Sequence, residues 1–471
     1  MMFSPSTSPL RAFEGFDSAV FKLLGLAILR GKILYVDIFD NKGPVLYLIN
    51  ALGQYFIPGR AGIFLLQILG MTSSLYFGFR TVRLIANPWL SFISILMTLF
   101  ICIPLIQEGN QCEEWTAYLL TPVLYLALKQ ADSVQLSNQS LWRKYRDGIL
   151  MGLFVSLAFF IRPNDALAIG VGGTFGCIAL MIAHGHWRES LRFSILWIVG
   201  FAIVSIPIVL WFAMKGVLPD LWYGMIGVNL DYIGGATMLS NILIPSRLWL
   251  LLLFASLWAM LYFLKQCQGW LCILFPCTFL VLWLMGSHAS GHYYLILFPI
   301  FVVYFGVLLC SSKPMAAIAL LAVLLSPQTM AMKPLPVLSA KTILASLRNS
   351  PTSHNEIMKS SELLFSYIPA NERDSIWNYN CGTLNNYGQI GIFYHNGVVP
   401  CNRILYDFKK NNGVDMPNYQ SLSSDDSGFP LWVVAILDES NILVYDSTFS
   451  GHYELVSCNS ERQALFRRKN P

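Results

Sequence analysis

The stretch FSILWIVGFAIVSIPIVLWFA, residues 193–213, contains no charged side chain. An α-helix of about 20 apolar residues crosses the roughly 30 Å hydrocarbon core of a membrane, because its backbone polar groups are satisfied internally. The whole chain has the same character: of its 471 residues, 55% are hydrophobic and 12% are charged, about half the charged share of soluble domains. The composition predicts an integral membrane protein. No basic stripe with interleaved aromatic residues is present, which argues against a nucleic-acid partner.

Similar apolar runs predict an all-α polytopic bundle of about ten visible transmembrane helices. They lie at 62–82, 89–106, 115–129, 148–161, 165–183, 193–213, 246–264, 269–286, 293–311 and 314–327. Two earlier helical stretches, 17–30 and 44–57, reach only roughly 21 Å each, too short to cross the core. We expect them to be interfacial helices, the first with an apolar stripe that excludes Lys22. Gly43-Pro44 marks the start of the second, since proline is favoured in a first helical turn.

The basic residues of the connecting loops predict the orientation. One set of loops carries ten of them: Arg80, Arg83, Lys129, Arg143, Lys144, Arg146, Arg188, Arg192, Lys265 and Lys313. The alternate set carries three: Arg162, Lys215 and Arg247. Cytoplasmic loops are enriched in Lys and Arg, so the first set is expected inside. We therefore predict a multi-pass protein of the inner or plasma membrane, with both ends of the chain outside.

Three regions follow from this pattern: an outer N-terminal region with the two interfacial helices (1–60), a transmembrane bundle (61–327) and a soluble extracytoplasmic α/β domain (328–471). In the last region Ser353 and Glu356 form a capping box that opens a helix to about Tyr367. Short strands are predicted at 375–380, 431–436 and 453–457. Cys381 and Cys401 are a candidate disulfide pair if the domain is outside. The ten cysteines show no metal-ligand spacing, which argues against a zinc site.

Acidic residues collect on the predicted outer side, where ten of the thirteen before residue 328 lie. Acids do little to set topology, so this bias points to function. GKILYVDIFDNKGP, residues 31–44, holds Asp37, Asp40 and Lys42 between the two interfacial helices. The alternative interpretation is a polar connector with a proline-initiated helix.

Four further outer segments carry polar side chains. In QEGNQCEEWT, residues 107–116, three carboxylates repel one another, so one of them should have a raised pKa. Alternatively, Glu113 and Glu114 occupy the first turn of a helix, where acids favour the dipole. In RPND, residues 162–165, Asp165 is the expected partner of Arg162. The remaining candidates are His292 and Tyr293, which also fit an aromatic belt, and Asn229 and Tyr232 in a long loop.

Together these segments place carboxylates, Lys42, Arg162 and His292 at one membrane face. Cations of this kind hold a phosphate, and a carboxylate can act as general base. The pattern predicts a site for a phosphate-bearing, lipid-linked substrate.

The run YVDIFDNKGPVLYLINALG, residues 35–53, preceded by DSAVF at 17–21, resembles the bacterial branch of the C-type membrane glycosyltransferases. These are the family-39, dolichyl-phosphate-mannose protein-mannosyltransferase-like enzymes, related to aminoarabinose transferases. EGNQCEEW, RPN, the loop with Asn229 and Tyr232, and HYYLILFP follow in the same order, so the resemblance covers most of residues 14–311.

The resemblance implies an inverting hexosyltransferase that moves a sugar from a polyprenyl-phosphate donor to a lipid, protein or surface-glycan acceptor of the cell envelope. It implies Asp17 as the catalytic base and Lys42 as the ligand of the donor phosphate, with Arg162, His292 and Tyr293 as further candidates for that anion. Glu113 and Glu114 are implied to orient the acceptor or Asp17. No cofactor is implied with certainty, and a divalent metal stays open.

Other interpretations are a transporter or lipid flippase, and an inactive, truncated copy. The second arises because relatives begin with a transmembrane helix before the catalytic loop, and residues 1–14 contain none. Transporters tend to show inverted repeats and charges inside their spans. No repeat is visible here, and the charges collect at one face, which favours the enzyme.

Overall fold

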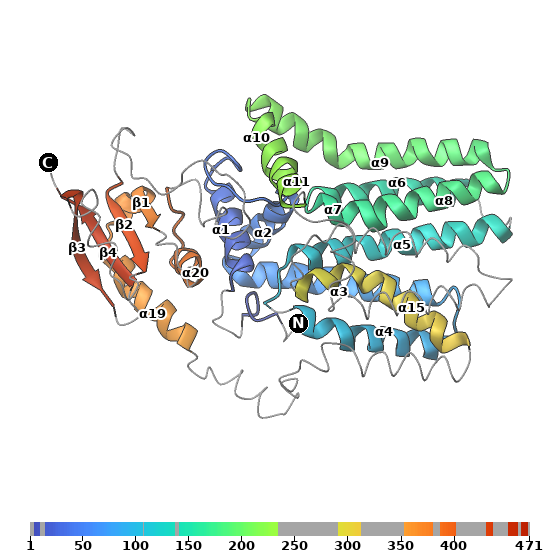
Figure 1. Ribbon diagram of the computed structural model, residues 1–471, viewed down its shortest axis with the longest axis horizontal. Coiled ribbons are helices and arrows are strands. Elements are labelled where there is room, and N and C mark those ends of the chain that lie inside the picture. The colour runs from blue at the N-terminus through green and yellow to red at the C-terminus, as the bar shows by residue number, and fades with distance from the viewer. Residues whose placement is uncertain are drawn as a thin grey trace.

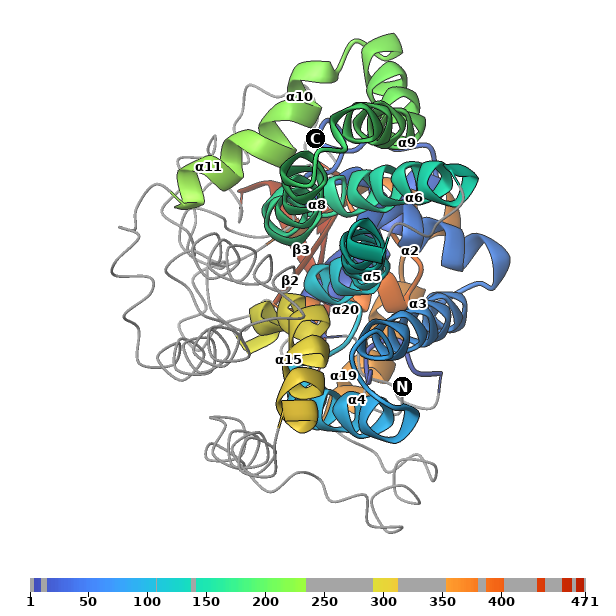
Figure 2. The ribbon, with the colours of Figure 1, turned by 90° about the vertical axis from the view of Figure 1, so that its right-hand side faces the viewer.

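The computed structural model describes residues 4–9, 15–106, 108–136, 141–233, 291–311, 353–379, 387–401, 430–436, 451–459 and 463–469. Within these ranges the chain forms a bundle of long helices at one end and a small sheet domain at the other, with two short helices between them (Figure 1). The view along the bundle shows its helices running side by side (Figure 2). The bundle consists of α3 (Arg60–Val82), α4 (Pro88–Cys102), α5 (Cys112–Leu136), α6 (Leu141–Phe159), α8 (Gly172–Ala183), α9 (Trp187–Met214) and α15 (Phe298–Ser311).

Four helices of the described residues are long and apolar enough to cross a membrane: Arg60–Val82, Pro163–Ala183, Trp187–Met214 and His292–Cys310. Helix α4 is apolar but shorter. The predicted spans 115–129 and 148–161 correspond to α5 and α6. These helices carry several charged residues and are not among the four that are long and apolar enough to cross a membrane. The predicted spans 246–264, 269–286 and 314–327 lie outside the described residues. The chain is therefore a helical protein with apolar spans, and the number ten stays a prediction.

Short elements join the bundle helices near the end that faces the sheet domain. Pro163–Ala183 comprises α7 (Pro163–Asp165), the π-helical turn η2 (Ala166–Val171) and α8. The others are η1 (Ile103–Ile106), α10 (Leu218–Trp222), the π-helical η3 (Tyr223–Gly227), α11 (Val228–Ile233) and the 3-10 turn η5 (Gly291–Leu297).

The two short helices are α1 (Asp17–Leu29) and α2 (Pro44–Phe56), close to the predicted bounds. Pro44 is the first residue of α2, as predicted, because its fixed φ suits that position. The position of Lys22 differs from the prediction, which placed this residue off the buried apolar stripe of α1. Lys22 is fully buried and donates a hydrogen bond of 2.7 Å to the carbonyl oxygen of Ser6. The helix is enclosed because neighbours cover both its faces.

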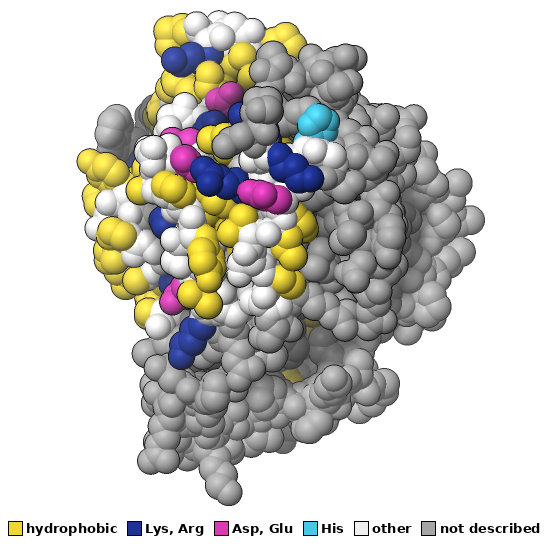
Figure 3. Space-filling model, turned by 90° about the vertical axis from the view of Figure 1, so that its left-hand side faces the viewer, with side chains coloured by type: hydrophobic (Ala, Val, Ile, Leu, Met, Phe, Trp, Pro, Cys, Tyr) yellow, Lys and Arg dark blue, Asp and Glu magenta, His cyan; other side chains and the backbone are white. Residues whose placement is uncertain are grey.

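The C-terminal domain contains a four-stranded sheet in the order β1-β2-β4-β3. Strand β1 (Ile376–Tyr379) pairs parallel with β2 (Trp432–Ile436), and β4 (Gln463–Arg468) pairs antiparallel with both β2 and β3 (Tyr453–Cys458). The helices are α19 (Ser353–Ser366), α20 (Tyr387–His395) and the 3-10 turn η6 (Ala370–Ser375). The mixed α/β character and three strands were predicted; β4 and α20 were missed. At the end of the molecule formed by the C-terminal domain, the described residues include charged side chains of both signs among apolar ones (Figure 3).

The C-terminal domain packs against α1 through α20. The ammonium group of Lys22 lies 5.0 Å from the centroid of the Tyr394 ring, and Arg30 donates a hydrogen bond to the carbonyl oxygen of Gly397. One continuous apolar core contains side chains of α1, α2, α20 and β2. The domain therefore holds α1 against the end of the bundle. Cys401 is a free thiol in this structure, which contradicts the candidate disulfide; its suggested partner Cys381 lies outside the described residues.

Candidate functional site

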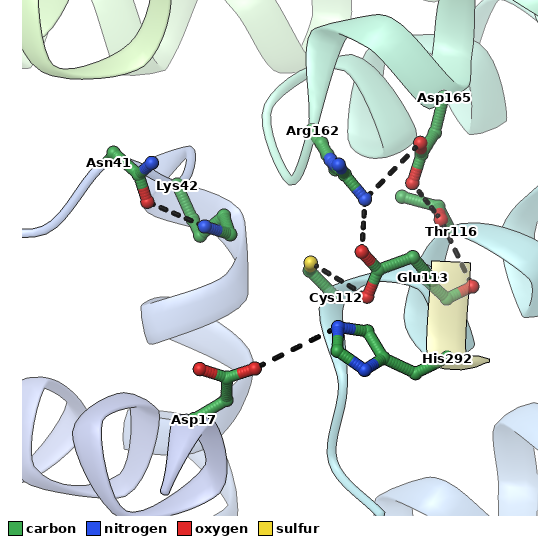
Figure 4. Close-up of polar contacts among 9 residues, drawn as sticks. All are labelled: Asp17, Asn41, Lys42, Cys112, Glu113, Thr116, Arg162, Asp165 and His292. Atoms are coloured by element: carbon green, nitrogen blue, oxygen red, sulfur yellow. Dashed lines mark hydrogen bonds and ion pairs between the residues drawn. The ribbon is translucent and has the colours of Figure 1, made fainter. Parts of the chain in front are cut away.

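Asp17 and His292 face each other where α1 meets the end of the bundle (Figure 4). Asp17 is the first residue of α1, and His292 follows Gly291 at the start of η5. Asp17 Oδ2 lies 4.0 Å from His292 Nε2, and the two side chains are 35% and 12% exposed. The carboxylate is therefore within ion-pair distance of the imidazole and still open to a reactant.

Arg162 lies beyond His292 and binds two carboxylates. Its guanidinium contacts Glu113, the second residue of α5, and Nη1 lies 3.7 Å from Asp165 Oδ1. Its carbon Cζ stands 4.6 Å from the centroid of the Tyr293 ring. The predicted pairing of Arg162 with Asp165 is confirmed, and Glu113 is a second partner.

Hydrogen bonds fix the two carboxylates as well. Thr116 Oγ1 donates to Asp165 Oδ2 at 2.8 Å, and the thiol of Cys112 donates to Glu113 Oε2 at 3.0 Å. These partners were not predicted, although both are in the quoted acidic segment. Removing Arg162 would therefore leave two buried carboxylates without a compensating charge.

Lys42 approaches the same region from the loop before α2. Its ammonium nitrogen donates to Asn41 Oδ1 at 2.5 Å. Among the described residues no carboxylate lies within ion-pair distance of this nitrogen, although Asp40 and Asp17 are close enough to favour its charged form. The loop is held from α11, where Asn229 Nδ2 donates to the carbonyl oxygen of Asn41 at 2.8 Å.

The electrostatic environment suits both residues to anion and proton chemistry. Burial raises the pKa of the Asp17 carboxyl above its ordinary value, although His292 and Lys42 favour the ionised form. The remaining exposure of Asp17 limits how far burial can act. Burial is the largest single influence on Lys42 and disfavours its charged form, but the negative groups around it, Asp40 foremost, together outweigh burial, and the pKa of the ammonium is raised. Lys42 is thus a cation and Asp17 a carboxylate of increased basicity.

Of the other predicted site residues, Asp40 acts electrostatically on Lys42 and Asp17, whereas Glu114 and Asp37 make contacts apart from this cluster. Glu114 is buried and accepts hydrogen bonds from Gln67 Nε2 at 2.9 Å and Tyr118 OH at 2.5 Å. Asp37 accepts the backbone N–H of Ile33 at 2.7 Å. Asp40 accepts the hydroxyl of Tyr47 at 2.7 Å, across the loop that carries Lys42. These contacts stabilise local structure. Tyr232 belongs to α11, but its side chain lies outside the described part of the structure.

Within the described residues no group of three or more His, Cys, Asp or Glu side chains has the arrangement of a metal site. Glu113 and Asp165 already neutralise Arg162. Binding of a divalent metal, which the sequence leaves open, is therefore a question that only experiment decides.

Gly43 brings the Lys42 loop against the segment that leads to Arg162. The N–H of Gly43 donates to the carbonyl oxygen of Ile161 at 2.8 Å. A Cβ at position 43 would lie 2.1 Å from the carbonyl oxygen of Phe160. Only glycine permits this backbone approach, which sets the spacing between the two cations.

We expect Gly43→Ala to destabilise the protein by about 2 kcal/mol or more, because the added methyl group must push two backbones apart. Gly173→Ala is the matched control, since a Cβ there meets only the Ala127 methyl group, at an ordinary 3.8 Å. Thermal unfolding of both variants in the same detergent checks this. Equal melting temperatures for the two would contradict the close approach.

Comparison with known proteins leaves the family open. No model of a known protein family matches this chain, and no curated protein matches it. Among solved structures, it is similar to the archaeal oligosaccharyltransferase AglB from Archaeoglobus fulgidus, solved in complex with an inhibitory peptide and a dolichol-phosphate. The identity is 11%, the TM-score is 0.48, and the match covers 97% of this chain and 70% of that one. At this level the similarity decides neither fold nor function.

Proposed function

We propose that this protein is a membrane glycosyltransferase that transfers a sugar from a polyprenyl-phosphate donor to an acceptor on the extracytoplasmic face. The observation that carries the proposal is the partly exposed Asp17 carboxylate, facing His292 beside Lys42 at the end of an apolar helix bundle. A carboxylate base with a cation close to it suits the transfer of a sugar from a phosphate-linked donor. The sequence resemblance points to the same reaction.

Asp17 is the proposed general base. It accepts the proton of an acceptor hydroxyl group while that oxygen attacks the anomeric carbon of the donor sugar. The bond from this carbon to the phosphate oxygen breaks, and the polyprenyl phosphate leaves with the bonding electrons. Attack from the face opposite to the phosphate inverts the configuration of the anomeric carbon. A carboxylate of raised pKa performs this step better than an ordinary aspartate.

Lys42 is the proposed ligand of the donor phosphate, where it offsets the charge that develops on the leaving group. Arg162 is a weaker candidate for direct contact, because Glu113 and Asp165 already satisfy its charge. We assign Glu113 the task of holding Arg162 and, through Tyr293 and η5, the position of His292. The acceptor can be a lipid, a protein or a surface glycan, and hexose transfer is the first type to test.

The direct test is a transfer assay. Membranes that contain the protein are incubated with a panel of labelled polyprenyl-phosphate sugars, and membranes without it serve as the control. We expect one donor to be consumed, with the label appearing in a product that is not lipid-phosphate linked. A donor that crosses the bilayer intact would instead identify a flippase. Consumption of no donor would count against the enzyme.

The proposal also requires the site to lie on the extracytoplasmic side of the membrane. In a variant whose ten own cysteines are replaced by serine, a single cysteine introduced at the partly exposed Lys42 should react with a membrane-impermeant thiol reagent in intact cells only if it is extracytoplasmic. Labelling that needs cell lysis would place the chemistry on the cytoplasmic side and overturn the proposal.

We expect Lys42→Met to raise the KM for the donor about tenfold or more, because methionine keeps the length of the side chain and removes the charge that holds the phosphate. Lys359→Met, on the C-terminal helix α19, is a matched control far from the site. An unchanged KM in the Lys42 variant would show that the phosphate binds elsewhere.

A further inference from the structure

A turn at Glu108–Asn110 holds α1 on both sides of Asp17. Glu108 Oε2 accepts the backbone N–H of Phe16 at 2.7 Å. Asn110 Nδ2 donates to Ser18 Oγ at 3.2 Å. Phe16 and Ser18 are the neighbours of Asp17 in sequence, so the proposed base lies between two fixed points. Neither Glu108 nor Asn110 was predicted as a site residue.

The backbone is shaped for these contacts. Gly15 has φ +68°, and a Cβ there would lie 2.5 Å from Glu108 Oε2. Gly109 and Asn110 have φ +77° and +60°, a region that asparagine tolerates better than other residues with a Cβ. Positive φ at three positions allows the turn and the start of α1 to approach closely. The two glycines adopt this conformation without strain, whereas at Asn110 it persists only where the surroundings enforce it.

The turn is itself tied to three other parts of the fold. Asn110 Nδ2 also donates to Asn50 Oδ1 of α2 at 2.9 Å, and Trp115 Nε1 of α5 donates to Asn110 Oδ1 at 2.9 Å. The backbone N–H of Ser6 donates to the carbonyl oxygen of Glu108 at 3.1 Å. One asparagine therefore joins α1, α2 and α5, and the N-terminal segment holds the turn from behind.

We infer that Glu108 and Asn110 are positioning residues, which fix the first turn of α1 and thereby the direction of Asp17 relative to His292. Glu108 caps the helix from another part of the chain: Phe16, the N-cap residue, makes no side-chain cap hydrogen bond, and a negative group is favourable at a helix N-terminus. The catalytic meaning of this arrangement rests on the proposed function, but the arrangement itself does not.

The charges around Glu108 agree with this role. Burial, followed by the charge of Asp17, raises the pKa of Glu108 to about 7, while the Phe16 N–H and Lys22 act in the opposite direction. Asp17 is in turn faced by His292 and Lys42. The sequence predicted a raised pKa in this acidic segment from repulsion within it, whereas the main cause for Glu108 is burial. Its charge therefore changes near neutral pH beside the start of α1.

Hydrogen exchange tests the inference without any activity assay. We expect the peptide that covers Phe16–Val20 to exchange about tenfold faster in Glu108→Ala than in the wild type, because a charged hydrogen bond to the helix start is lost. Glu108→Gln keeps an acceptor oxygen and should exchange at close to the wild-type rate. Glu454→Gln, on exposed β3, is the matched control. Equal rates in Glu108→Ala and the wild type would overturn the inference.

A second variant guards against global unfolding, which would also accelerate exchange in a peptide from α9, a helix without a contact to this turn among the described hydrogen bonds. Asn110→Gly keeps the positive φ at no steric cost and removes only the side-chain contacts. We expect about tenfold faster exchange of the same α1 peptide. An unchanged rate in this folded variant would show that Asn110 does not hold α1.

The activity measurement separates this inference from the proposed function. If the wild type transfers sugar, Glu108→Ala and Asn110→Gly should lower kcat about tenfold with little change in the KM for the donor, and Glu108→Gln should restore part of the loss. A rise in KM with unchanged kcat would overturn the positioning role. If the wild type transfers no sugar, the proposed function fails, and the exchange rates still decide whether the turn holds α1.

Discussion

Replacing Asp17 by asparagine is expected to lower the rate of sugar transfer by a factor of about 10² to 10⁴, the usual contribution of a general base. Asparagine has nearly the same shape as aspartate, but its amide cannot accept the proton of the acceptor hydroxyl. The carboxylate faces His292 at 4.0 Å and is not part of the buried ion-pair cluster of Arg162, so the fold should tolerate the change.

The measurement is kcat with the donor identified in the transfer assay, together with the KM for the donor, which should change little. Asp374→Asn is the matched control, because this residue belongs to the exposed turn η6 of the C-terminal domain. Transfer at the wild-type rate in Asp17→Asn would show that another group takes the proton, and it would remove the main support for the mechanism.

Replacing Arg162 by leucine is expected to destabilise the protein by about 3–5 kcal/mol at neutral pH, the usual cost of removing one partner from a buried ion pair. Glu113 and Asp165 would then lie close together without a compensating charge. Both carboxyl groups would bind protons more readily in the folded protein than in the unfolded chain. The loss of stability should therefore be largest at high pH and become smaller as the pH falls.

Thermal unfolding in one detergent between pH 5 and pH 8 measures this effect. Arg83→Leu is the control, since Arg83 is exposed at the end of α3 and donates to the carbonyl oxygen of Ala86; a change of about 0.5 kcal/mol or less is expected there. The double variant Arg162→Leu with Glu113→Gln should recover part of the stability, because one uncompensated charge is removed. A single variant as stable as the wild type would contradict the ion-pair arrangement.

Local patterns predicted several helix starts well. Pro44 opens α2 where its dipeptide with Gly43 predicted a start, and Glu113 and Glu114 do occupy the first turn of α5. In these places the information lies within one helical turn of sequence. Helix α20 was missed because its residues include two glycines, which are poor helix formers. Packing against α1 is what stabilises it.

The separation of the acidic residues could not be read from their order. Glu113 and Glu114 are neighbours in sequence, but they point to different partners, Arg162 and Tyr118, because successive side chains of a helix lie about 100° apart. Glu108, five residues before Glu113, contacts α1 instead. Which face of α5 meets which helix depends on packing across the whole bundle.

Composition and periodicity were sufficient to identify an apolar helical bundle with a polar α/β domain after it, because burial in lipid and burial in a core both select residue types over short windows. For Asp17, Lys42, Arg162 and His292, the sequence predicted only that they lie at the same membrane face. Asp17 and His292 meet from distant parts of the sequence, and the close backbone approach at Gly43 brings the Lys42 loop against the segment before Arg162. Such contacts depend on distances between elements, which no local pattern in the chain encodes.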